Sequence, residues 1–213
     1  MCGIKVFHLA FEPTGSAACA VNDAGAAILL NANQIRWRRN FDLAHELFHI
    51  LTWHIFRTDQ DDDVVNNEKE EKFATCFASN LLMPRYAVRH AINQVIDDNK
   101  ISFADMFNIA RQFDVSVEAL CWRMGFLKYF DLEQIPNIAE RYRIHSAKWE
   151  SGREHDNPPT RPPRFEALAK KALRQGYISL GRFAEYMEIS RREAWQYVEQ
   201  ETEENETIEI SPA

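Results

Sequence analysis

Long apolar runs are missing from this 213-residue chain, and its few cysteines follow no recognisable spacing. No segment approaches the roughly 18 to 20 consecutive apolar residues that a membrane-spanning helix requires, and the amino terminus lacks the charged and apolar regions of a signal peptide. The four cysteines include no Cys-x-x-Cys pair, which argues against both a disulfide framework and a thiolate zinc site. We therefore expect a cytoplasmic protein with reduced thiols.

An excess of basic residues is also missing. The chain has 25 Lys and Arg against 32 Asp and Glu, a formal net charge of -7. This balance argues against a nucleic-acid-binding surface that covers the whole molecule. Only seven Gly and eight Pro are present, and 46% of the residues are hydrophobic. The composition therefore indicates a globular protein with one substantial core and a small additional module.

A proline-rich stretch separates two parts of the chain. Residues 151–163 hold four prolines, a glycine and charges of both signs, which is typical of an extended linker. Residues 1–150 are expected to form the main domain. Residues 164–198 show helical periodicity and predict a small helical module, whereas residues 199–213 are acidic, contain few large apolar side chains and are expected to be disordered.

The main domain is predicted to have an α+β fold. Two short apolar runs, residues 4–11 and 26–30, are separated by turn-forming residues and predict strands. Helical periodicity begins at Asp42, which is placed to cap a helix that reaches about residue 56. A second helix is expected from about residue 68 to Pro84, which cannot continue a helix interior. We expect a small antiparallel or mixed sheet packed on these two helices, followed by a mostly helical half.

The segment LAHELFHIL places His45, Glu46 and His49 in a His-Glu-x-x-His pattern on the first predicted helix. Positions i and i+4 of a helix lie one turn apart on the same face, so both imidazoles can reach one zinc ion at about 2.0 to 2.1 Å. Glu46 lies beside them and is not needed as a ligand. Its carboxylate can therefore take a proton from water that the ion activates near neutral pH. The pattern predicts a zinc site with Glu46 as general base.

A catalytic zinc site needs a third protein ligand, and the second predicted helix offers three glutamates. Glu71 is favoured, because Glu70 starts a different face of the helix and Glu68 lies nearer to its frayed start. Small residues beyond Glu71 would let this helix lie close to another backbone, while large apolar residues fill the core beside it. The small residues are Ala74, Thr75 and Ala78, and the expected core residues are Phe73, Phe77 and Leu81.

These paired motifs resemble those of the ImmA/IrrE zinc metallopeptidases, which are gluzincin-like enzymes. The matching pieces are ILLN at 28–31, Arg38, FDLAHELFHIL at 41–51, and the segment EKFATCFASNLLMP at 71–84. The resemblance is strong over residues 4–130 and looser over the rest, and it implies that the main domain, residues 1–150, is a zinc metallopeptidase. It also implies that Zn²⁺ is bound by His45, His49 and Glu71, with Glu46 as the base.

The function that the resemblance implies is limited proteolysis of a partner protein. The partner is typically a helix-turn-helix transcriptional repressor encoded nearby, whose cleavage relieves repression during stress or mobile-element induction. Two positions depart from the family pattern: Phe48 stands where glycine is common, and Asn40 stands where a basic residue is frequent. Because Phe48 is bulky, we expect a narrower cleft beside the metal. The chain also starts at its first predicted strand, where the family often has a preceding helix, which leaves open a truncated or divergent member.

Several further side chains remain open as contributors to the site. His54 lies nine residues beyond His45, about half a turn out of phase, so a structural role is expected. The strand at 26–30 is a candidate to accept an extended substrate by β-augmentation, and a purely structural strand is the alternative. The candidate donors to a transition state are His8, Arg38, Tyr86 and His90.

Two segments, residues 109–124 and 181–198, resemble helix-turn-helix units. The first is expected to be a packed hairpin of the main domain, because residues such as Val115, Leu120 and Trp122 suit a core. The second has basic residues on and before it, so protein docking, DNA binding and plain packing remain open, with DNA binding less favoured than protein docking. An alternative function therefore remains, in which a non-proteolytic, metal-containing regulatory module acts through this C-terminal unit.

Overall fold

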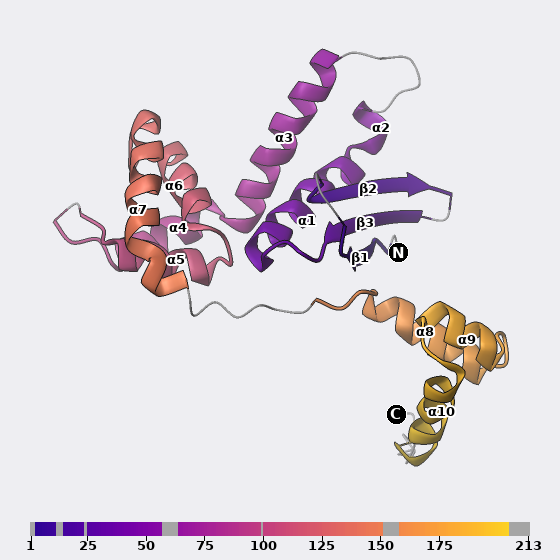
Figure 1. Ribbon diagram of the computed structural model, residues 1–213. Helices are drawn as coiled ribbons and strands as arrows, with labels where there is room; N and C mark the ends of the chain where they lie inside the picture. The colour runs from indigo at the N-terminus through magenta and orange to yellow at the C-terminus, as the bar shows by residue number, and fades with distance from the viewer. Residues whose placement is uncertain are drawn as a thin grey trace, which may run out of the picture. The chain divides into compact units, whose positions relative to one another are not determined.

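The computed structural model describes residues 3–11, 15–23, 25–56, 64–98, 100–150 and 158–204. The chain divides into two compact units, Met1–Thr160 and Arg161–Ala213 (Figure 1). Most of the predicted linker and most of the predicted tail lie outside the described residues. Within the described part of the chain, no helix is both long and apolar enough to cross a membrane.

The first unit opens with a three-stranded mixed sheet, as the α+β prediction requires. Its strands are β1 (Lys5–Leu9), β2 (Ala17–Asn22) and β3 (Gly25–Asn31). The strand order is β1-β3-β2, with β3 parallel to β1 and antiparallel to β2. Gly25 has a positive φ of 110° at the β2–β3 turn, a conformation that suits a residue without a Cβ.

The central position of β3 corrects one expectation. Both edges of β3 are hydrogen-bonded, with Ala27 paired to Lys5 on one side and to Ala20 on the other. Strand addition needs a free row of backbone donors and acceptors, which β3 does not have. Of the two alternatives for this strand, substrate addition is therefore excluded and the structural one remains.

Helix α1 (Arg36–Leu51) packs against β2 and β3, and α3 (Val64–Leu82) packs along α1 (Figure 1). The short helix α2 (Trp53–Phe56) follows α1 and contacts α3. Because α1 begins at Arg36, Asp42 lies inside the helix, and the prediction that Asp42 is its N-cap is wrong. Helix α3 ends at Leu82, before Pro84, as predicted.

The buried stripe of α3 is narrower than expected. Ala74 and Ala78 are fully buried, so the backbones of α1 and α3 can approach closely, as the small residues predict. Glu70 lies four residues before Ala74 and is buried with it. Phe73 and Leu81, however, are exposed, so their assignment to the core is wrong.

A helical cluster completes the first unit. It consists of α4 (Arg85–Asn93), α5 (Phe103–Gln112), α6 (Val117–Phe126), the 3-10 helix η1 (Leu132–Gln134) and α7 (Ile135–Glu150). Ser102 and Ser116 cap α5 and α6 by accepting hydrogen bonds from backbone N–H groups of the first turn. The predicted hairpin at 109–124 is confirmed, since Val115 and Leu120 are buried in the core of this cluster. Trp122, in contrast, is exposed, and its predicted core position is wrong.

The described part of the second unit, residues 161–204, contains three helices, α8 (Pro163–Arg174), α9 (Leu180–Met187) and α10 (Arg191–Glu204). Phe183 is the largest side chain in its small core. The turn between α9 and α10 passes through Glu188 in the left-handed conformation, with a φ of 48°. Ser190 and Glu193 then form a reciprocal capping box at the start of α10. Helix α10 extends to Glu204, beyond residue 198, where the predicted module ends.

Candidate metal centre

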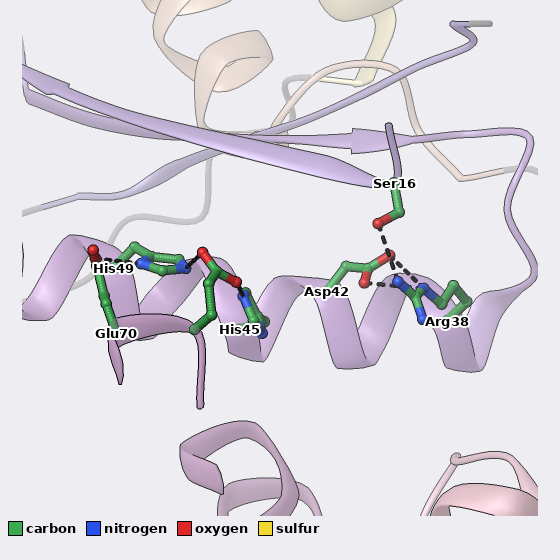
Figure 2. A network of polar contacts seen from close by, with 7 residues as sticks. Ser16, Arg38, Asp42, His45, His49 and Glu70 are labelled. Atoms are coloured by element: carbon green, nitrogen blue, oxygen red, sulfur yellow. Dashed lines mark hydrogen bonds and ion pairs between the residues drawn. The ribbon is translucent and has the colours of Figure 1, made fainter. Parts of the chain in front are cut away.

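Helix α1 presents His45 and His49 on one side, one turn apart. Figure 2 shows Arg38, Asp42, His45 and His49 following one another along this side of α1. The two imidazole ring centroids lie 5.0 Å apart. The His49 side chain is 5% exposed and the His45 side chain 17% exposed, so the pair lies mostly below the surface.

Glu71 approaches both histidines from α3. The Oε2 atom of Glu71 lies 3.0 Å from Nε2 of His45, and its Oε1 atom lies 3.5 Å from Nε2 of His49. All three ligand atoms lie within 4.8 Å of one another, and within the described residues no other group of histidine, cysteine or acidic side chains is arranged in this way. The structure therefore brings together the three residues that the sequence singles out.

The three ligand atoms are close enough to hold one metal ion. Tetrahedral zinc with bonds of about 2.0 to 2.2 Å has neighbouring ligand atoms roughly 3.3 to 3.6 Å apart. The two separations measured here, to different oxygens of Glu71, are 3.0 and 3.5 Å. Two imidazoles and one carboxylate form a donor set that suits zinc. The Glu71 side chain is 53% exposed, so the side of the centre away from the histidines is open to solvent and to a substrate.

Glu46 lies on α1 directly after His45 and is partly buried. Among the described residues, no hydrogen bond or ion pair engages its carboxylate. Its position beside the histidines and its uncommitted carboxylate are compatible with proton transfer near the metal centre.

Glu70 is the residue that sequence reasoning missed. Its Oε1 atom accepts a hydrogen bond of 2.6 Å from Nδ1 of His49, and both side chains are almost fully buried (Figure 2). The sequence does contain a signal for this burial, because Glu70 lies four and eight residues before Ala74 and Ala78. Glu70 thus shares the stripe of α3 that contacts α1, whereas Glu71 stands beside that stripe.

A second polar network holds the first half of α1. Nε of Arg38 lies 3.1 and 3.2 Å from the two carboxylate oxygens of Asp42, and Nη2 of Arg38 donates to Oγ of Ser16 at 3.2 Å (Figure 2). Burial raises the pKa of Asp42 above its ordinary 3.8, although Arg38 and Ser16 act in the opposite direction. This network joins α1 to the segment that leads into β2.

The other candidate side chains lie outside the three-residue cluster. His54 is exposed on α2, as its phase on the helix predicts. His8 contacts the carbonyl oxygen of Pro159, and His90 contacts the side chain of Gln94. Tyr86 is exposed on α4. Of the four candidate transition-state donors, only Arg38 lines the cleft described next.

A cleft of about 1300 Å³ extends from Glu71 between α1, α3 and α6. Aromatic side chains from two of these helices line it, namely Trp37, Phe41, Trp122 and Phe126. Phe48, which was expected to narrow the cleft, is not part of its lining and instead packs against Phe56 and Phe77.

Asp114, in the turn between α5 and α6, joins this turn to the start of α1. Its Oδ2 atom accepts hydrogen bonds from Nε of Arg36 at 2.7 Å and from Nδ2 of Asn40 at 2.8 Å. Asn40, which departs from the family pattern, therefore makes a specific contact between α1 and the helical cluster.

Comparison with known proteins agrees with this geometry. A search of curated proteins finds no match. The model of a peptidase family, described as the IrrE N-terminal-like domain, matches residues 2–124, which is more than half of the chain and includes α1, α3 and the metal-centre residues. The chain belongs to this IrrE N-terminal-like family of peptidases.

Proposed function

We propose that this protein is a zinc-dependent endopeptidase that performs limited proteolysis of a partner protein in the cytoplasm. The observation that carries the proposal is the convergence of His45, His49 and Glu71 within 4.8 Å, at the edge of a cleft large enough for several residues of a polypeptide. Membership of a peptidase family supports the same reaction class.

In this proposal, His45 and His49 would hold the ion through their imidazoles and Glu71 would hold it through its carboxylate. When bound, the ion supplies Lewis acidity, which activates water near neutral pH and polarises the scissile carbonyl group. Glu46 accepts the proton of the attacking water and passes it to the nitrogen of the departing amine. Solvent exposure of Glu71 leaves room for the substrate on that side.

The proposed substrate is a helix-turn-helix transcriptional repressor encoded beside the protein, in stress or mobile-element regulation. The resemblance to ImmA/IrrE enzymes suggests this class of partner. The aromatic lining of the cleft supports an apolar protein segment as the part that enters it, because aromatic side chains provide large contact areas at low cost in conformational entropy.

The test is a comparison of wild type with Glu46→Gln, using the neighbouring repressor and denatured casein as two separate probes. The wild type should cleave the repressor at a discrete position, lose activity with a chelator and regain it with zinc. Glu46→Gln should bind zinc as the wild type does but cleave at least about 10²-fold more slowly. Glu133→Gln, an exposed substitution on η1, serves as the control. Cleavage at the wild-type rate by Glu46→Gln would exclude the proposed role of Glu46.

A second candidate function is a non-proteolytic regulatory module that acts through α9 and α10. Arg191, Arg192 and Trp195 are exposed on α10, the helix that corresponds to a recognition helix, and this observation favours binding through that face. In that case, Glu46→Gln would leave the regulatory output in cells unchanged, whereas Arg191→Ala combined with Arg192→Ala would abolish it. The peptidase proposal expects the opposite pattern.

A further inference from the structure

The buried carboxylate of Glu70 is the starting observation. Its side chain is 7% exposed, and among the described residues its only hydrogen-bond or ion-pair partner is Nδ1 of His49, 2.6 Å away. Burying a carboxylate is costly unless it is well paired, so this side chain needs its partner. The contact is also the most buried polar contact at the metal centre.

The two histidines are supported differently. Nδ1 of His49 is engaged by Glu70, which leaves Nε2 of His49 directed towards Glu71. Within the described part of the chain, the only hydrogen bond of His45 is the one from Nε2 to Glu71. A carboxylate on one ring nitrogen fixes the tautomer and the plane of an imidazole, so that the other nitrogen can bind a metal. His49 has such a support, and His45 has none among these residues.

We propose that Glu70 is a positioning residue, which holds the His49 ring with Nε2 directed at the metal ion and thereby increases the affinity of the site for zinc. This inference rests on the proposed metal centre and adds a residue that the His-Glu-x-x-His pattern does not contain. Helix α3 then contributes two consecutive residues to the site. Glu71 is a ligand, and Glu70 positions the ligand His49 on α1.

The role of a positioning residue differs from that of a contact that only holds two helices together. A purely structural tie would stabilise the packing of α1 on α3 and would affect the metal-free and metal-bound protein alike. A positioning residue changes the free energy of metal binding itself, because the ring must be ordered each time the ion binds without it. Zinc affinity therefore separates the two roles, and activity is not needed as a readout.

The experiment measures zinc affinity of the full chain by competition with a chromophoric chelator, and the visible spectrum after Co²⁺ loading. Glu70→Ala should bind zinc about 10- to 100-fold more weakly than the wild type and should give an altered Co²⁺ spectrum. Glu70→Gln retains an oxygen that can accept the Nδ1 hydrogen, so it should recover most of the affinity and the wild-type spectrum. Glu133→Ala, which removes an exposed carboxylate on η1, is the control and should change neither.

Each outcome decides the inference. Unchanged zinc affinity and an unchanged spectrum in Glu70→Ala would overturn it, even if that variant unfolds at a lower temperature. If Glu70→Ala does not fold, the isosteric Glu70→Gln and the shortened Glu70→Asp remain, and Glu70→Asp should bind zinc more weakly than Glu70→Gln. A wild-type chain with no zinc affinity would overturn both this inference and the proposed function, whereas a zinc-binding wild type with an unaffected Glu70→Ala variant would overturn this inference alone.

Discussion

Arg123 on α6 donates its Nε hydrogen to the main-chain oxygen of Met83, 2.9 Å away and just beyond the end of α3. Its Nη2 atom also donates to Oδ1 of Asn80 at 2.8 Å. The guanidinium is buried, which lowers its pKa, and within the described residues no carboxylate pairs with it. The Arg123 side chain thus joins the helical cluster to the helix that carries Glu70 and Glu71.

Arg123→Met should therefore destabilise the protein by about 1 to 3 kcal/mol, because Met83 and Asn80 lose a donor in a buried place. The free energy of unfolding in urea, followed by tryptophan fluorescence, measures the change. Arg143→Met, at a largely exposed position on α7, should change it by no more than about 0.5 kcal/mol. Equal effects of the two substitutions would show that the hydrogen bonds of Arg123 to Met83 and Asn80 contribute no more to the free energy of unfolding than an exposed side chain does.

Because the thiol of Cys121 is buried, we expect the protein to lose stability at alkaline pH. Burial, followed by the nearby charge of Glu118, raises the pKa of its thiol from 9.0 to about 12. Because the folded pKa is the higher one, the contribution of this group is fully present below pH 9 and is lost as the pH rises towards 12, with a slope of up to about 1.4 kcal/mol per pH unit. Cys121→Ala should show a shallower decline of the free energy of unfolding between pH 9 and pH 10.5. Identical slopes in the two proteins would contradict the burial of an uncharged thiol.

Asp42 on α1 leads to a similar prediction at acidic pH. Its folded pKa is raised, so the ionised carboxylate is disfavoured by the fold, and stability falls as the pH rises from 3.8 through the folded pKa. Asp42→Asn keeps an oxygen acceptor for Arg38 without the buried charge, and it should be at least as stable as the wild type at pH 7. Relative to the wild type, it should gain stability between pH 4 and pH 7 in urea denaturation. Asp131→Asn, an exposed control before η1, should show no such trend, and a destabilised Asp42→Asn at pH 7 would contradict the prediction.

Metal removal should lower the melting temperature of the first unit. A ligand that binds only the folded state and is present at 1,000 times its Kd adds about 4 kcal/mol to the free energy of unfolding. Differential scanning calorimetry with a chelator and then with added zinc should show a fall and a recovery in the wild type and in His54→Ala. His45→Ala should respond to neither addition. A zinc response in His45→Ala that equals that of the wild type would place the ion elsewhere.

The ligand candidates could be predicted because they depend on local periodicity. His45 and His49 are separated by one helical turn, which fixes their common face whatever the rest of the fold does. The choice of Glu71 as the third ligand stays a prediction, and the structure places its carboxylate beside both imidazoles. The family resemblance covers the same segments.

Glu70 and Asp42 could not be placed in this way, because their roles depend on contacts between elements. Glu70 is an acidic residue at a buried position. Only the packing of α3 on α1 shows that His49 is its partner. Asp42 resembles an N-cap in sequence, yet α1 starts earlier, at Arg36, and Arg38 and Ser16 provide its partners. Periodicity contains no information on such pairings.

The remaining differences concern exposed apolar side chains and one strand. Trp122 and Phe73 have the composition of core residues, but both are exposed and Trp122 lines the cleft. The missed strand β2 consists mainly of small residues, AACAVN, whose alternating burial is visible only once β3 lies beside it. An alanine-rich segment gives a weak strand signal, because alanine favours helices and is depleted in strands.

Asp114 joins two segments that are distant in sequence, the start of α1 and the α5–α6 turn. Its ion pair with Arg36 is largely exposed and adds little to stability, whereas its hydrogen bond with Asn40 is partly buried. We expect these contacts to couple the opening of the two segments. Amide hydrogens at both places should exchange with solvent in a single cooperative opening, and a polypeptide that occupies the cleft should slow their exchange together.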